Sequence, residues 1–310
     1  MASSALSPEA VVRSPAPPAS RRSHLSLRAL GVVGALAAIT LTGCDFGTLD
    51  SLSTDVAGEG GSELSLLSRG LLSKYQAGSD AEYKTLVRDI EGVMQRAIDG
   101  NGGDSNLKLE PLKPADIADL GLPPRDVTAA QGMIILTELP CTLSQVEKLT
   151  AAKNQPELFP KTYDNYLRTY TSSSEDYFAR KVKTLTWTTD LTATVLSRQY
   201  QSDLRGSVRF VPGAGPTGGD LVLSRTVLVK PATFLKGSDA QFNQDYQIEA
   251  FYERAAGRTV HVYALWRQFL VGSISSADDL YISIILGNLK DFDVRVGKIC
   301  REGTPLPDVR

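Results

Sequence analysis

The side chains that could do acid–base or nucleophilic chemistry are few and widely spaced. The chain has two histidines, His24 and His261. Catalytic triads and histidine metal sites need a histidine beside a nucleophile or beside further ligands. His261 stands between two valines in an apolar segment, where a histidine without a catalytic role is expected. No two carboxylates are visibly spaced for acid–base work, so we predict no enzyme, no catalytic residue, no metal and no cofactor.

Two short stretches resemble ligand sites but have simpler explanations. Residues 213–219 (GAGPTGG) lack the Lys-Ser/Thr ending of a phosphate loop, and no helix follows them, so we predict a hairpin loop. Asp278 and Asp279 are oxygen ligands suited to a cation. Their position at the start of a predicted helix, which Ser276 is expected to cap, explains them without a metal.

Aromatic side chains on predicted strands are the better lead. We predict that they line one cavity for an apolar molecule. They are Trp187, Phe210, Phe251, Tyr263, Trp266 and Phe269. Arg225 and Arg267 occupy alternating strand positions and are predicted to meet an acidic head group. The alternative is that these residues are ordinary core aromatics and surface arginines.

The N-terminus has the layout of an export signal. Arg21, Arg22 and Arg28 precede the uncharged apolar run LGVVGALAAITLTGC, residues 30–44. The run is too short for a spanning helix and ends in small residues. Its last four residues, Leu41-Thr42-Gly43-Cys44, resemble a bacterial lipobox. That resemblance implies removal of a signal peptide, residues 1–43, and lipidation of Cys44.

A lipidated chain would be a membrane-anchored protein of the bacterial cell envelope, facing the periplasm or the exterior. Residues 20–25 resemble a twin-arginine signal; an ordinary positively charged lead is the alternative. Cleavage removes four arginines and one glutamate from 33 basic and 35 acidic residues, and leaves 267 residues with a net charge of −5. No block of Lys and Arg remains that could displace phosphate counterions, so we predict no nucleic-acid partner.

The two other cysteines, Cys141 and Cys300, form an even pair in an expected oxidising compartment. We predict that they form a disulfide. It would close a loop of about 160 residues, for which the chain-entropy model gives roughly 4–5 kcal/mol at most. Two buried free thiols are the alternative.

Composition and periodicity divide the rest of the chain. Residues 44–61 are small, polar and glycine-rich, as expected of a flexible tether. Two helices follow, 62–76 and 79–100, the second opening with the capping-box sequence Ser79-Asp80-Ala81-Glu82. We predict a helical hairpin docked on the main domain; an apolar stripe that binds a partner helix is the alternative. A linker, 101–129, contains a short helix.

The main domain, 130–300, combines strands with two helices. Helical spacing predicts a short helix from Thr142 and a long one at 276–299, followed by a polar tail, 301–310. Alternation of period two, with one polar face, predicts strands at 132–139, 184–195, 207–211, 221–230, 246–254 and 259–271.

Successive strands joined by glycine-rich turns indicate an antiparallel meander, with the long helix covering one face. The predicted fold class is α+β: an N-terminal helical hairpin plus a curved antiparallel sheet packed on a long C-terminal helix. A small β-barrel or another α+β roll is the alternative. The element order over residues 132–300 resembles the START-like, or SRPBCC, helix-grip family. That resemblance implies a cavity for a lipid or similar apolar molecule, and a Cys141–Cys300 bridge fits it.

Two functions follow from different classes. The first is an envelope-anchored binding module for an apolar small molecule or lipid. The second is a structural or protein-interaction lipoprotein with a filled core and no ligand, which would act through the helical hairpin or an exposed sheet edge.

Overall fold

The computed structural model describes residues 61–100, 106–159, 163–237 and 239–303. The predicted signal peptide, the lipobox with Cys44, nearly all of the tether and most of the polar tail lie outside the described residues. Within the described ranges, no helix combines the length and the apolar character that a membrane crossing requires.

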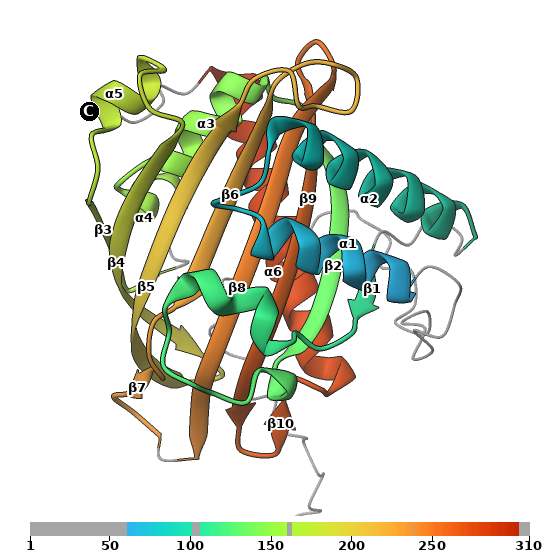
Figure 1. The fold of residues 1–310 in the computed structure, drawn as a ribbon. Helices are drawn as coiled ribbons and strands as arrows, with labels where there is room; N and C mark the ends of the chain where they lie inside the picture. The colour runs from blue at the N-terminus through green and yellow to red at the C-terminus, as the bar shows by residue number, and fades with distance from the viewer. Residues whose placement is uncertain (1–60, 101–105, 160–162, 238, 304–310) are drawn as a thin grey trace, which may run out of the picture. The chain divides into compact units, whose positions relative to one another are not determined.

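A curved antiparallel sheet of ten strands organises the described residues (Figure 1). Its strands run in the order β1-β2-β9-β8-β6-β5-β4-β3, with β10 paired to β9 and β7 paired to β5. The strands are β1 (Asn106–Leu109), β2 (Gln131–Leu139), β3 (Asn165–Tyr170), β4 (Thr184–Val195), β5 (Arg198–Val211), β6 (Leu221–Leu228), β7 (Thr233–Phe234), β8 (Ala240–Ala255), β9 (Arg258–Val271) and β10 (Ile274–Ser275).

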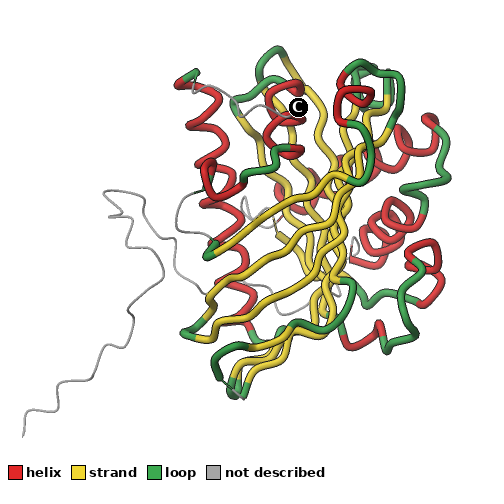
Figure 2. The backbone as a smooth tube through the Cα atoms, turned by 90° about the vertical axis from the view of Figure 1, so that its left-hand side faces the viewer, coloured by secondary structure: helices red, strands yellow, loops and turns green. Residues whose placement is uncertain are grey.

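Helices cover both faces of the sheet (Figure 2). The helices are α1 (Gly61–Ser73), α2 (Asp80–Gly100), α3 (Leu143–Ala151), α4 (Gln155–Leu158), α5 (Ser174–Phe178) and α6 (Asp279–Glu302), with 3-10 turns η2 (Pro114–Leu120) and η3 (Val127–Ala129). Side chains of α1, α2 and η2 pack on one face, whereas α3, α4 and α6 pack on the other. This arrangement confirms the predicted α+β class, with its helical hairpin, antiparallel sheet and long C-terminal helix.

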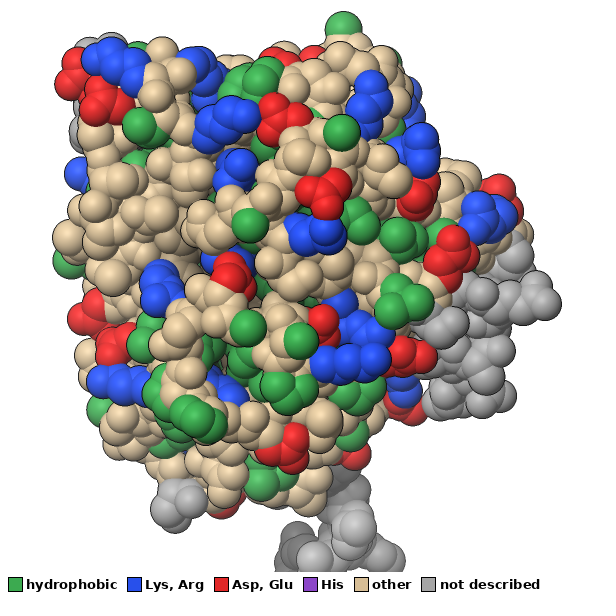
Figure 3. Space-filling view, viewed as in Figure 1, with side chains coloured by type: hydrophobic (Ala, Val, Ile, Leu, Met, Phe, Trp, Pro, Cys, Tyr) green, Lys and Arg blue, Asp and Glu red, His purple; other side chains and the backbone are tan. Residues whose placement is uncertain are grey.

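The helical hairpin forms where its sequence signals lie. The Ser79 amide donates to the Glu82 carboxylate at 2.9 Å, and the Glu82 amide donates to the Ser79 hydroxyl at 3.3 Å, which completes the predicted capping box. The stripe of α2 is fully buried at Tyr83 and Val87 and packs in one cluster with the sheet. The docked hairpin is therefore observed. Acidic and basic side chains are interspersed on this side of the molecule (Figure 3).

Three apolar clusters occupy the opposite face, which we call the α6 face. One of them joins β2 and β9 to α6 and includes Ile135, Leu265 and Leu286. The other two lie toward the two ends of α6. The disulfide cluster lies near the C-terminal end of α6; it includes Leu185, Trp187, Val208, Val222, Phe251, Val296 and Ile299. The distal cluster lies near the N-terminal end of α6; it includes Leu191, Leu204, Leu228, Phe242, Phe269 and Tyr281. Both clusters contain residues of β4, β5, β6 and β8, so they share one sheet surface and leave its centre between them.

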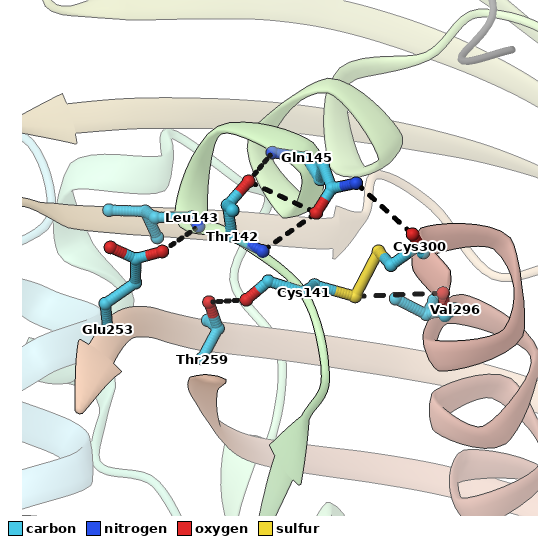
Figure 4. Close-up of a disulfide and its surroundings, with 8 residues drawn as sticks. All are labelled: Cys141, Thr142, Leu143, Gln145, Glu253, Thr259, Val296 and Cys300. Atoms are coloured by element: carbon cyan, nitrogen blue, oxygen red, sulfur yellow. Dashed lines mark hydrogen bonds between the residues drawn. A yellow bond between two sulfur atoms is a disulfide. The ribbon is translucent and has the colours of Figure 1, made fainter. Parts of the chain in front are cut away.

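The predicted Cys141–Cys300 disulfide is confirmed, with the two Cα atoms 5.3 Å apart (Figure 4). It joins the chain just after β2 to the last turn of α6. The Thr259 hydroxyl donates to the Cys141 carbonyl at 2.8 Å, and the Gln145 side-chain amide donates to the Cys300 carbonyl at 3.4 Å. Gln145 also completes a capping box with Thr142, the predicted start of α3. The bridge thus fixes the C-terminal end of α6 to the β2–α3 corner.

Several predicted boundaries differ from the structure. Strands β1, β3, β7 and β10 were not predicted, and β5 begins at Arg198 rather than residue 207. The loop at 213–219 joins the antiparallel neighbours β5 and β6, so the predicted hairpin loop is confirmed. Helix α6 begins at Asp279, and the predicted cap at Ser276 is wrong, because the Ser276 hydroxyl accepts from the Phe269 amide at 3.4 Å instead.

Candidate functional site

The seven residues predicted to bind a ligand divide between the two faces of the sheet. Five of them lie on the α6 face; these are Trp187, Phe210, Phe251, Tyr263 and Arg267. Trp266 and Arg225 lie on the opposite face, which the helical hairpin covers and which we call the hairpin face. The Trp266 indole donates to the Glu110 carbonyl at 2.9 Å, and Arg225 donates to the Asp119 carboxylate at 2.6 Å. The prediction of one cavity lined by all seven is therefore wrong for Trp266 and Arg225, because successive residues of a strand point to opposite faces.

Both predicted arginines already have carboxylate partners. Arg225 is bonded to Asp119 and lies 4.4 Å from the centre of the Tyr75 ring. Arg267 makes a bidentate pair with Asp245, with two N···O distances of 2.9 Å. These pairs remove the reason to expect an acidic head group at either arginine.

The centre of the α6 face is polar and remains partly accessible. Thr226 of β6 pairs with Gln247 of β8, and Glu249 follows on the same face of β8. All three side chains are partly exposed, although β6 and β8 are the central strands of the sheet, and the Glu249 side chain keeps 15% of its exposure. We call Thr226, Gln247 and Glu249 the polar floor.

Apolar groups surround the polar floor. On β8, the next residue of the α6 face after Glu249 is Phe251, which belongs to the disulfide cluster. On β6, the next residue of that face after Thr226 is Leu228, which belongs to the distal cluster. From α6, Ile285, Leu289 and Phe292 pack toward the same face and are only partly buried. The arrangement suits a molecule that is apolar at its ends and carries a polar group between them.

A buried ionic chain connects the polar floor to α6. His261 of β9 is 2% exposed, and its Nε2 lies 3.1 Å from the Glu249 carboxylate. Its Nδ1 lies 3.0 Å from the Asp293 carboxylate on α6, and Asp293 also accepts from the Thr137 hydroxyl. Burial alone would lower the pKa of His261, but the two carboxylates outweigh it and raise that pKa to about 10. Each ring nitrogen therefore donates a proton to a carboxylate, as an imidazolium does.

A second buried network orients Gln247. Its side-chain amide donates to Asp245 at 2.5 Å, and Asp245 is held in the pair with Arg267. An amide that donates through its nitrogen keeps its carbonyl oxygen as an acceptor. That oxygen accepts no hydrogen bond from any described residue.

Trp187 lies beside the polar floor because Gly206 makes room for it. A Cβ added at Gly206 would lie 2.2 Å from the indole nitrogen of Trp187. Gly206 pairs with Thr226, so the indole crosses β5 toward the floor. The Arg168 guanidinium lies 4.4 Å from the centre of the Trp187 ring and donates to the Ala152 carbonyl at 3.1 Å, which fixes the outer side of the indole.

Two hydroxyl groups on the same face are buried and unpaired. Thr189 of β4 and Ser202 of β5 are 3% and 2% exposed, and neither hydroxyl has a hydrogen-bond partner among the described residues. They are diagonal neighbours, since Thr189 pairs with Leu204 and Ser202 with Leu191. An unpaired buried hydroxyl costs about 1–3 kcal/mol, so each group has a reason to accept a partner.

A separate pocket of about 280 Å³ lies at the far end of β8, β9 and β10. Its walls include Gln131, Gln241, Asn243, Gln268 and Phe269. Phe269 is the one member of the predicted aromatic set that lines it. Among the described residues, no group of three or more His, Cys, Asp or Glu side chains has the geometry to hold a metal ion.

The residues that the sequence interpretation missed are the acidic and amide side chains of β8. Asp245, Gln247 and Glu249 recur at every second position, so a strand must place them on one face. The residues between them are apolar and face the hairpin. That alternation was the available signal. The partners of His261 gave no signal, because Asp293 is 32 positions away on another element.

Comparisons with known proteins give likenesses in fold alone. No protein-family model and no curated protein matches this chain. Among solved structures, a START superfamily protein from Mycobacterium smegmatis matches at 8% identity and a TM-score of 0.36, covering 56% of this chain and 99% of that one. Human STARD10 matches at 8% identity and a TM-score of 0.36, covering 63% of this chain and 82% of that one.

A third match comes from the human StarD13 lipid transfer and protein localization domain, at 11% identity and a TM-score of 0.34. The alignment covers 70% of this chain and 97% of that domain.

Proposed function

We propose that this protein binds a small, mainly apolar molecule between the sheet and α6, with a polar group of that molecule resting on the polar floor. The main support is the partial exposure of Thr226, Gln247 and Glu249, which lie in the two central strands of a sheet that has helices on both faces. Polar side chains at such positions are normally buried with partners or replaced by apolar residues. A ligand would account for their accessibility.

The surroundings of the floor support the same proposal. The disulfide cluster and the distal cluster offer surface for the hydrophobic parts of a ligand, at roughly 25 cal/mol for each Å² that they remove from water. The unpaired hydroxyls of Thr189 and Ser202 offer further hydrogen bonds on the same face. The ionic chain through His261 and the disulfide tie α6 to the sheet at two points, which keeps the site organised before binding.

We further propose that the protein is a lipoprotein of the bacterial cell envelope, anchored through Cys44. This part rests on the charged start, apolar run and lipobox of residues 21–44. The test is Cys44→Ser, which should move the protein from the membrane fraction to the soluble fraction. Unchanged membrane association would contradict the anchor.

Native mass spectrometry of the full chain, with solvent extraction of whatever copurifies, tests the binding proposal. We expect a bound apolar molecule of defined mass, released by the solvent. Gln247→Leu should lower its occupancy, whereas Gln241→Leu, a change of the same kind at an exposed position of β8, should not. A clean unliganded mass, with no uptake from a lipid extract, would contradict the proposal and favour a protein-interaction function.

A further inference from the structure

We infer that the polar group of the ligand is cationic, and that Glu249 selects molecules bearing a primary ammonium group. The inference deepens the proposed function and rests on it. It follows from the charge and from the hydrogen-bonding groups that the polar floor presents.

The charge at the floor itself is negative, whereas Arg168, beside Trp187 on the same face, is a cation without a carboxylate partner among the described residues. Glu249 and Asp293 flank His261, so two carboxylates share one imidazolium and retain a net charge of −1. The neighbouring Asp245–Arg267 pair is neutral as a unit. Because these groups are mostly buried, water screens the remaining negative charge poorly. A cation placed on the floor would neutralise it.

The floor also presents two acceptor oxygens that receive no hydrogen bond from a described residue. One Glu249 oxygen accepts from His261, and its other oxygen accepts from no described residue. One N–H of the Gln247 amide donates to Asp245, and the Gln247 carbonyl oxygen accepts from no described residue. An ammonium group has three N–H donors and no acceptor, and therefore matches this pattern. A carboxylate or phosphate would find donors in the Thr226 hydroxyl and the second N–H of the Gln247 amide, but it would also meet the like charge of Glu249.

An aromatic residue stands next to Glu249 in the sheet. Tyr263 pairs with Glu249 directly across the β8–β9 ladder. The faces of such rings attract cations, with the largest effect where water is excluded.

Three ligands of matched length test the inference on the purified full chain near neutral pH: decylamine, decanol and decanoic acid. Isothermal titration should show decylammonium binding at least about tenfold more tightly than decanol, with decanoate the weakest. Glu249→Gln keeps the shape and the acceptor for His261 but removes the charge. In this variant the dissociation constants of decylamine and decanol should differ by no more than about twofold, and the affinity for decanol should be unchanged.

Glu175→Gln is the matched control, since it removes the same charge from an exposed residue of α5 and should leave the preference intact. Decanol or decanoate binding as tightly as decylammonium to the unaltered chain would overturn the ammonium inference and leave the binding proposal standing. Failure of all three to bind would overturn the binding proposal itself. Both outcomes are measured on the unaltered chain, so they hold whether or not Glu249→Gln folds.

Discussion

His261 and Asp293 form an ion pair that joins the sheet to α6, with His261 Nδ1 3.0 Å from Asp293 Oδ1. His261 lies on β9 and is 2% exposed, and the Asp293 side chain is 9% exposed. The pair lies at the edge of the disulfide cluster, because the His261 ring stacks on Phe251 at 4.5 Å. The helix is therefore held to the sheet by a charged contact that depends on the protonation of one histidine.

That dependence predicts how stability changes with pH. The folded pKa of His261, about 10, exceeds its ordinary value of 6.5. Its contribution to the free energy of unfolding is therefore fully present below pH 6.5, declines above it, and is lost as the pH passes 10. Urea unfolding at steps across this window should show a loss of up to a few kcal/mol. The His261→Gln variant should lack this decline, and a flat profile in the unaltered chain would contradict the ion pair.

A comparison of two threonines tests the unpaired hydroxyls. Thr137→Val removes a hydroxyl that donates to Asp293, and should lower the free energy of unfolding by about 1–3 kcal/mol. Thr189→Val removes a buried hydroxyl without a partner among the described residues, and should leave the stability of the ligand-free protein unchanged or raise it. Chemical denaturation measures both. Equal losses in the two variants would show that the Thr189 hydroxyl has a partner.

Gly206 is expected to be essential for the placement of Trp187. In Gly206→Ala the new methyl group would overlap the indole and displace it, at a cost on the order of 1–3 kcal/mol. Tryptophan fluorescence and chemical denaturation report both effects. Gly219→Ala is the control, because nothing lies within 4 Å of a Cβ at that loop position. An unchanged spectrum in Gly206→Ala would refute the contact.

Loss of the disulfide should destabilise the whole α6 face. Replacing both cysteines by serine, or reducing the bridge, should lower the free energy of unfolding by roughly 4–5 kcal/mol at most, since the bridge closes a long loop in the unfolded chain. Cys44→Ser, which leaves the bridge intact, is the control. Equal stability with and without reductant would contradict a bridged native state.

The sequence predicts the parts of this fold whose signals are local. The Ser79–Glu82 capping box, the cap at Thr142 and the alternation of β9 all depend on neighbours within a few residues. The start of β5 was predicted too late, because Ser202 and Gly206 interrupt the apolar alternation among the residues that β5 presents to the α6 face. Both interruptions lie in the candidate site: one is an unpaired hydroxyl, and the other makes room for Trp187.

The rest of the site depends on contacts between distant segments. Which residues of different strands share a face follows from strand register. Tyr263 and Trp266 are three positions apart on β9, however, so alternation along that one strand already predicts opposite faces for them. Strand β3 was missed because its inward residues, which include Tyr166 and Arg168, give no apolar alternation. The charge on His261 could not be predicted at all, since it depends on carboxylates 12 and 32 positions away.

The most direct test of binding between the sheet and α6 uses the two tryptophans of the chain, one on each face. A bromoalkyl alcohol quenches an indole only on close approach. We expect saturable quenching of Trp187 in the Trp266→Phe variant and little quenching of Trp266 in the Trp187→Phe variant. Equal quenching of both indoles, or stronger quenching of Trp266, would contradict a binding site on the α6 face.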